Sequence, residues 1–264
     1  MEEILQSERN NCIKKICEDL YALGVKTGDT LLVHASYKSM GAIEGGAKTF
    51  FEALISYLGD EGTLVMPALS FDSVTFENPY FKAKETPSCI GYLPEYFRTS
   101  VEGVRRSLHA THSCCAIGRN AEELLADHEL DETPVGEHSP FRKLPNYDGK
   151  ILFVGCSSDH NTSMHGVEEL ADPPYWVNRD QRVNYTIEDE HGNQMHCLSY
   201  RHGFVVDGKH IRQRYSRIEG LLDDGEITRG KLLMADCTLM SAKAVWSKGV
   251  EKMKNDPWYF VDKP

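Results

Sequence analysis

The pattern of apolar and polar positions over the first 70 residues predicts a helix, a strand, a second helix and a second strand. Apolar residues recur near helical spacing between positions 3 and 23, which predicts an amphipathic helix ending at Gly24. Short apolar runs at 30–34 and 63–67 predict buried strands, with a helix at 47–58 between them. This order is typical of a parallel α/β unit, in which ligands bind beyond the carboxyl ends of the strands.

The remaining pattern predicts further α/β elements and one β-rich segment. Residues 68–92 are aromatic, polar and rich in turn residues, so we expect an irregular excursion that lines a site or covers it. Next come a helix at 93–99, a strand with a polar entry at 109–118, a helix at 121–126, a short helix near Arg142 and Lys143, a strand at 151–154, a hairpin of 182–187 with 194–200, a short helix at 217–222, a strand at 228–235 and a closing helix at 239–252. The chain shows no internal repeat or flexible linker, which favours a single domain over 1–264 with a β-rich insertion around 175–215.

Charge and composition narrow the partners. The formal net charge of −11 argues against nucleic acid, which requires clustered Lys and Arg. It suits a cationic small molecule, although acidity for solubility alone also explains it. We expect no membrane partner, because no apolar run approaches about 18 residues and the first residues do not have the pattern of a signal peptide. The eight scattered cysteines have no paired spacing and indicate the reduced thiols of a cytoplasmic protein.

One stretch, residues 159–168, is unusually rich in groups that move protons. His165 and Glu168 share a helical face if a helix begins near Thr162, and a carboxylate beside a histidine is the arrangement of a general base. The simpler interpretation is that Asp159 or Thr162 caps this helix and that His165 is a core histidine. A metal site of His160, His165 and Glu168 is disfavoured, because the two histidines do not share a face and the HExxH spacing is absent.

Two other groups of residues suggest chemistry without settling it. His109 and His112, with Ser113, suggest a metal pair or a nucleophile with its base, although no GxSxG elbow is present. The neighbouring Cys114 and Cys115 lie in an apolar run typical of core thiols. After the first strand, Gly41, Gly45 and Gly46 follow the hydroxyls of Ser36 and Ser39 and the charge of Lys38. Such a loop can hold a pyrophosphate, although neither common phosphate-loop motif occurs.

Four blocks in this order and spacing resemble the aminoglycoside 3-N-acetyltransferase family. They are 33–41 with 44–46, 62–67, 109–113 with Gly118, and 159–168. The resemblance covers nearly the whole chain. It implies a three-layer α/β/α fold with a mixed central sheet, distinct from the common fold of N-acetyltransferases. It also implies acetyl-coenzyme A as donor, no metal, and transfer to an amine, usually the 3-amino group of a 2-deoxystreptamine aminoglycoside, with antibiotic resistance as the result.

The resemblance also implies roles at the matching positions. His165 corresponds to the catalytic histidine and Glu168 to its carboxylate partner, while Asp159 shapes the same site. The coenzyme A loop corresponds to His34, Ala35, Ser36, Tyr37, Lys38, Ser39, Met40 and Gly41, and a strip near the thioester to His112 and Ser113. For a cationic acceptor we expect Thr162 and the acidic side chains Asp72, Glu77, Glu169 and Asp172 to contribute.

The mechanism expected from these residues is direct transfer in a ternary complex of a monomer or homodimer. His165 takes the proton of the attacking amine, and backbone N–H groups near Ser113 or the Thr162 hydroxyl stabilise the oxyanion. Three alternatives remain open: an acetyltransferase for a different amine, a coenzyme A-binding relative without activity, and a metal-dependent hydrolase.

Overall fold

A mixed seven-stranded sheet forms the centre of the computed structural model, which describes residues 2–263. Its strands lie in the order β12-β13-β6-β1-β2-β5-β4. Their bounds are β1 Thr30–Ala35, β2 Thr63–Pro67, β4 Arg105–Arg106, β5 Cys114–Gly118, β6 Lys150–Val154, β12 Ile227–Leu232 and β13 Ala235–Ser241. β1 is parallel to both β2 and β6, whereas the other pairs are antiparallel. The parallel βαβ unit expected from the first 70 residues is therefore confirmed.

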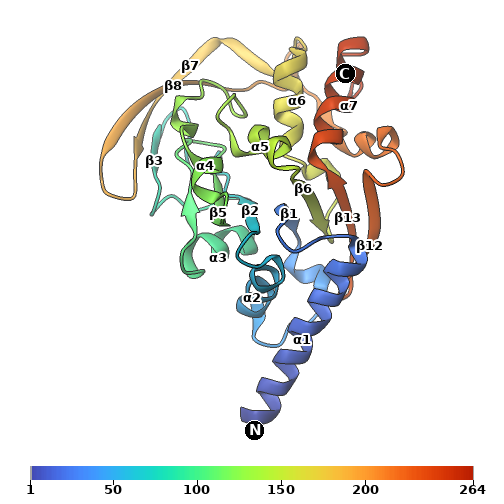
Figure 1. Cartoon of the computed structure of the whole chain (residues 1–264). Helices are drawn as coiled ribbons and strands as arrows, with labels where there is room; N and C mark the ends of the chain where they lie inside the picture. Colours follow the sequence, from blue (N-terminus) through green and yellow to red (C-terminus); the bar gives the residue numbers. More distant parts are fainter. Residues whose placement is uncertain (1, 264) are drawn as a thin grey trace.

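Helices cover both faces of this sheet (Figure 1). One face carries α1 Glu2–Leu23, α2 Gly46–Leu58 and α3 Tyr92–Ser100. The other carries α4 Ala121–Leu125, α5 Pro140–Lys143, α6 Ser163–Ala171 and α7 Ala242–Asn255. Alternate strand residues point to opposite layers: Leu31 and Val33 pack with the first set and Leu32 with the second. The expected three-layer α/β/α class with a mixed sheet is confirmed.

A long hairpin projects from the sheet and arcs to one side in Figure 1. It consists of β7 Val177–Glu188 and β8 Gln194–His202, and β3 Tyr80–Lys82 pairs with β7 to complete a small sheet. The hairpin has its own buried cluster, which includes Phe81, Val183 and Tyr185. The expected hairpin is confirmed and runs longer than the pattern predicted. The two-residue strands that follow are β9 Val205–Val206, β10 Lys209–His210, β11 Arg212–Gln213 and β14 Val261–Asp262.

Short 3₁₀ helices occupy several connections: η1 Tyr37–Met40, η2 His128–Leu130, η3 Leu144–Tyr147, η4 Ser158–His160 and η5 Tyr215–Leu221. The last is the short helix expected at 217–222, of the 3₁₀ type and beginning at Tyr215. A difference lies at 228–235, where one strand was expected and an antiparallel pair is present, with β12 at the sheet edge and β13 beside β6. The turn at Leu233 has φ 53°, and its neighbour Met234 is exposed, so the continuous apolar letters hid a chain reversal.

The predicted cap of the α6 helix is wrong in its details. Thr162 stands at the N-cap position without a side-chain cap hydrogen bond, and instead Asn161 Oδ1 accepts from the Ser163 N–H at 3.1 Å. Asp159 turns away to accept from the Ser216 N–H. Asp159 and Thr162 are therefore left for other roles.

Among residues 2–263, no helix is both long enough and apolar enough to cross a membrane.

Candidate active site

A cavity of about 1040 Å³ opens at the edge of the sheet where β1, β2 and β6 end. Because these strands are parallel, the segments that follow Ala35, Pro67 and Val154 meet there. The first residue of β5, Cys114, lies opposite Pro67, so the residues just before β5 reach the same edge. Apolar and aromatic side chains make much of the wall, among them Leu69, Phe71, Ile90, Tyr92, Leu93 and Phe204.

A histidine, a tyrosine and a glutamate are linked by hydrogen bonds at this cavity. Tyr215 Oη lies 2.6 Å from Glu168 Oε2 and 3.0 Å from His165 Nδ1, and the direct distance from His165 Nδ1 to Glu168 Oε2 is 3.6 Å. Glu168 is fully buried, whereas 17% of the His165 side chain is exposed and lines the cavity. The tyrosine thus connects the two residues that the sequence placed together.

The protonation states follow from these contacts. Burial, together with the charge of Glu168, raises the pKa of the Tyr215 hydroxyl well above its ordinary value, so it keeps its proton. Its single proton is donated to the Glu168 carboxylate, so its oxygen accepts from His165 Nδ1–H. That hydrogen bond fixes the tautomer in which Nε2 carries a lone pair, which is the form that a general base needs.

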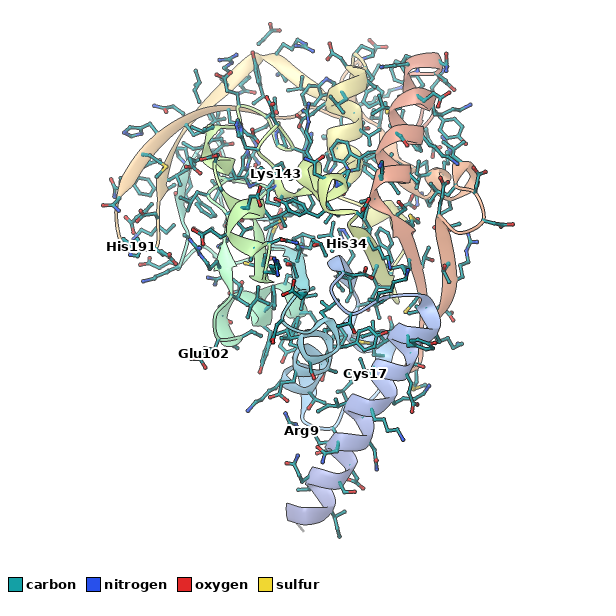
Figure 2. All side chains as sticks on the ribbon, in the orientation of Figure 1. Arg9, Cys17, His34, Glu102, Lys143 and His191 are labelled. Carbon is teal, nitrogen blue, oxygen red and sulfur yellow. The ribbon has the colours of Figure 1, made fainter. Side chains whose placement is uncertain are left out.

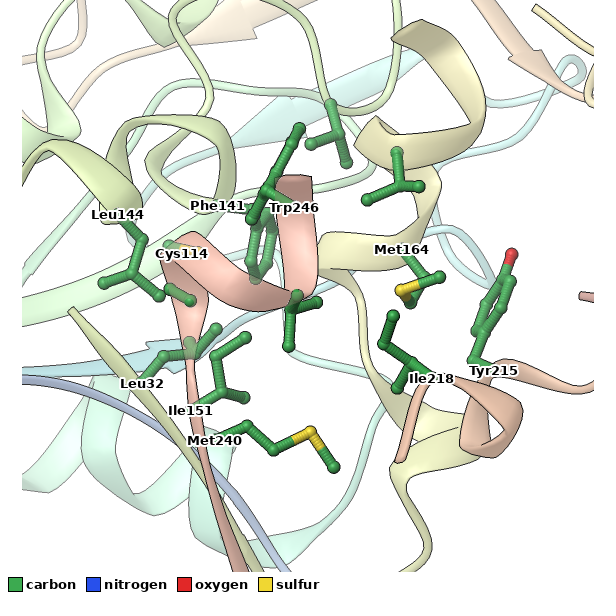
Figure 3. Close-up of a cluster of buried hydrophobic side chains, with 14 of the residues drawn as sticks. Leu32, Cys114, Phe141, Leu144, Ile151, Met164, Tyr215, Ile218, Met240 and Trp246 are labelled. Atoms are coloured by element: carbon green, nitrogen blue, oxygen red, sulfur yellow. The ribbon is translucent and has the colours of Figure 1, made fainter. Parts of the chain in front are cut away.

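Figure 3 shows how Tyr215 is held at one edge of the larger core cluster, beside Ile218 and near Met164. Its ring packs there while its hydroxyl points out of the cluster. His165 is carried by α6, whose glycine at position 166 packs against Trp246 of α7. Close packing of α6 on α7 therefore sets where His165 lies.

The segment between β6 and α6 supplies further polar groups, and Asp159, His160 and Thr162 all line the cavity. Asp159 Oδ1 accepts from the Ser216 N–H at 2.7 Å. Although partial burial opposes the shift, hydrogen bonds from Ser216 and Ser157 and the charge of Arg214 lower the pKa of Asp159. Asp159 is thus an ionised carboxylate that ties this segment to the start of η5.

The end of β1 and the loop after it divide into two parts. His34, Ala35, Ser36, Tyr37 and Lys38 line the cavity, whereas Ser39, Met40 and Gly41 do not. Ser39 Oγ lies 3.0 Å from the Gly155 carbonyl, Met40 is buried in the core, and Gly41 faces Met234. Gly45 and Gly46, at the start of α2, also lie outside the lining.

His34 is a buried residue near the end of β1. Figure 2 places it near the centre of the molecule, in contrast to the peripheral Glu102 and His191. Its ring stacks on Phe153 at 5.0 Å between centroids, and burial lowers its pKa to about 3. His34 is therefore a neutral imidazole that packs against Phe153 beneath the loop.

The polar entry to β5 contributes one residue of the two expected. His112 lines the cavity, whereas Ser113 is buried behind it, where its hydroxyl donates to the Ala68 carbonyl at 2.8 Å and accepts from Arg106 Nε. His109 is also buried, and its Nδ1 accepts from the N–H groups of Thr111 and His112. Ser113 and His109 therefore fix the turn that presents His112.

The acidic residues expected at the acceptor do not line the cavity. Asp72 is exposed beyond the lining, and Asp172 bonds the Trp176 indole N–H and Arg179 at the end of α6. Glu169 accepts from the Thr133 hydroxyl and the Val135 N–H, both at 2.6 Å. Glu77 lies in an adjoining cavity of about 830 Å³, which shares Arg201 and His202 with the first. Asp159 is the acidic side chain among the lining residues.

Two residues at the centre of the site were not anticipated. Tyr215 comes 50 residues after His165, and His202 stands at the end of the hairpin with its ring 4.2 Å from that of His165. Neither lies in a motif that marks it, so only the folded chain reveals them.

A buried tyrosine–carboxylate pair that orients a histidine, set in a large cavity at the edge of a mixed α/β sheet, defines the site of an acid–base enzyme. The family model for aminoglycoside 3-N-acetyltransferases matches residues 32–254. The chain belongs to this family, whose members transfer an acetyl group.

Curated relatives extend the match over most of the chain. An aminoglycoside N(3)-acetyltransferase III from Salmonella sp is 32% identical over 269 residues, covering 90% of this chain and 89% of the relative. An SPbeta prophage-derived aminoglycoside N(3')-acetyltransferase-like protein, YokD of Bacillus subtilis (strain 168), is 30% identical over 226 residues, covering 78% and 75%.

Solved structures are similar in fold as well. The structure of AAC-IIIb binary with CoASH has a TM-score of 0.78 at 27% identity, covering 92% of this chain and 96% of that one. A mutant of the aminoglycoside acetyltransferase AAC(3)-IVa in complex with a gentamicin has a TM-score of 0.75 at 26% identity, covering 95% and 91%.

Proposed function

We propose that the protein moves the acetyl group of acetyl-coenzyme A to an amine of an aminoglycoside, at the 3-amino group of 2-deoxystreptamine, and so confers resistance. The observation that carries the proposal is the hydrogen-bonded series His165–Tyr215–Glu168 at a cavity of about 1040 Å³. Relatives named for this reaction, and the CoASH and gentamicin complexes of similar structures, support the choice of donor and acceptor.

In this mechanism the free amine attacks the carbonyl carbon of the thioester. His165 Nε2 takes the proton that the amine loses, and the imidazolium is stabilised through Tyr215 by the buried Glu168 charge. The carbon–sulfur bond then breaks, and the coenzyme A thiolate receives the proton from His165. The Thr162 hydroxyl is our candidate for the oxyanion donor, because it lines the cavity whereas the Ser113 side chain is turned away.

We assign the donor to the wall formed by His34, Ala35, Ser36, Tyr37 and Lys38, where Lys38 supplies a positive charge for phosphate. We assign the acceptor to the part of the cavity near Asp159 and Thr162, with Glu77 at the adjoining cavity as a longer-range attraction for a polycation. All eight cysteines are free thiols, which supports a reducing cytoplasm as the place of action.

The experiment is thiol release from acetyl-coenzyme A across a panel of 2-deoxystreptamine aminoglycosides and simple primary amines. The proposal expects release only when an aminoglycoside is present, and an N-acetylated product of matching amount. Release with simple amines alone identifies an acetyltransferase for a different acceptor. Binding of coenzyme A without release for any amine identifies a protein that only binds coenzyme A.

A further inference from the structure

Three histidine rings from separate segments meet on one wall of the cavity. His112 precedes β5, His165 belongs to α6, and His202 ends β8. Their ring centroids lie 4.9 Å apart for His112 and His202, 4.2 Å for His165 and His202, and 5.7 Å for His112 and His165. One nitrogen from each ring lies within 4.8 Å of the nitrogens of the other two. Packing alone can bring three rings this close together. The hydrogen bonds of each ring therefore decide whether the three histidines could bind a ligand.

Each ring has a nitrogen available as a ligand. His112 Nδ1 lies 2.8 Å from Thr111 Oγ1, and His165 Nδ1 lies 3.0 Å from Tyr215 Oη, so both rings have their Nε2 to offer. A partner on the second nitrogen that fixes the ring is typical of histidines that bind metals. The first two features of a metal site, convergence and orientation, are thus present.

His202 supplies an independent observation. Both of its ring nitrogens are buried, and among residues 2–263 neither has a partner in good hydrogen-bond geometry, although the Trp176 backbone lies close to the ring. A buried polar group without a partner is energetically costly and calls for an explanation, such as a bound ion.

We propose that His112, His165 and His202 form a Zn²⁺ site, and that its occupancy inhibits acetyl transfer. Imidazole ligands select zinc and its transition-metal neighbours over Mg²⁺ and Ca²⁺. Zinc–nitrogen bonds of about 2.0–2.1 Å place the nitrogens of a tetrahedral site roughly 3.3 Å apart. The three nitrogens, which now lie within 4.8 Å of one another, must therefore move closer together when the ion binds. The fourth position of the ion faces the cavity, which lies beside all three rings.

Inhibition follows because His165 Nε2 cannot hold a metal ion and accept a proton from an amine at the same time. This half of the inference rests on the proposed function of His165. The binding half does not, because it needs only the three rings.

The test compares the wild-type protein with His202→Phe in metal titrations followed by calorimetry and, with Co²⁺ as a probe, by visible absorption. The His202 ring stacks on Phe204 with 4.8 Å between ring centroids. Phenylalanine keeps an aromatic ring in this place and removes both unpartnered nitrogens, so the variant should fold. The matched control is His196→Phe, an exposed position on the same strand. Only the part of the binding that depends on His202 counts, because the eight free cysteines can also take zinc.

We expect wild type and His196→Phe to bind one Zn²⁺ at the His202-dependent site. Acetyl transfer should fall in proportion to the occupancy of that site and should recover after a chelator is added. Loss of outer-shell partners alone typically weakens metal affinity about 10–100-fold, so His202→Phe should lose at least that much. Equal affinity in His202→Phe overturns the site. Saturating zinc without loss of acetyl transfer, or zinc-stimulated thiol release without an amine, overturns the inhibition. If metal-free protein acetylates no amine, the proposed function fails while the binding comparison still stands.

Discussion

Replacing Tyr215 with phenylalanine removes the one hydroxyl that joins His165 to Glu168 and leaves the packed ring in place. Glu168 Oε1 already has no hydrogen-bond partner among the described residues, so the variant leaves a fully buried carboxylate without this donor. A hydrogen bond to a charged group is worth about 1.5–3 kcal/mol. Because a tenfold change in rate corresponds to about 1.4 kcal/mol, kcat should fall by roughly 10- to 100-fold.

The assay is steady-state thiol release with acetyl-coenzyme A and an aminoglycoside, together with coenzyme A binding by calorimetry. Binding should stay close to wild type, because Tyr215 acts through His165. The matched control is Tyr57→Phe, which removes a hydroxyl that donates to the Val25 carbonyl at 2.8 Å, outside the cavity lining. If Tyr215→Phe keeps the wild-type kcat, or changes KM alone, the reasoning that Tyr215 connects the base to its carboxylate is refuted.

Three further outcomes follow from other residues. In Gly166→Ala the new methyl group meets Trp246 at 2.2 Å and Val135 at 2.6 Å, so urea denaturation should show a free energy of unfolding lower by about 1–3 kcal/mol. Gly220→Ala, with open space around it, should change that free energy little. Equal effects of the two substitutions would contradict the packing account of α6. Burial raises the pKa of Glu169 from 4.5 to about 7, so the folded state binds a proton that the unfolded state releases, and stability is lost as the pH rises between these two values. Glu169→Gln should remove up to about 3 kcal/mol of this pH dependence in unfolding curves measured from pH 4.5 to 7.5. An unchanged pH dependence of stability in the variant would contradict the assignment. For a polycationic acceptor KM should rise with ionic strength, and a flat KM argues against such a substrate.

The first half of the fold could be predicted because its signals are local. The apolar runs at 30–34 and 63–67, separated by an amphipathic helix, admit little besides a parallel unit, and β1 and β2 form it. The pair β12 and β13 escaped prediction because a tight turn at Leu233 interrupts an apolar segment without a glycine or proline to mark it.

The site was predictable only as far as its residues are neighbours in sequence. His165, Asp159 and the loop from His34 to Lys38 were expected at one place, and the structure brings them to one cavity. His202 ends the hairpin strand β8 and Tyr215 comes 13 residues after it, so no local spacing relates either residue to His165. The acidic residues expected at the acceptor lie outside the cavity lining for a different reason, because a residue type does not reveal the direction in which its side chain points. Glu169, for example, points from α6 toward the loop at Val135 instead of the cavity.

The central claim, that His165 is the base for acetyl transfer, is tested most directly by the turnover of His165→Ala, measured as thiol release at saturating acetyl-coenzyme A. General-base catalysis typically contributes about 10²–10⁴ in rate, so turnover should fall by that factor while coenzyme A affinity is nearly unchanged. Full activity in His165→Ala would contradict the account.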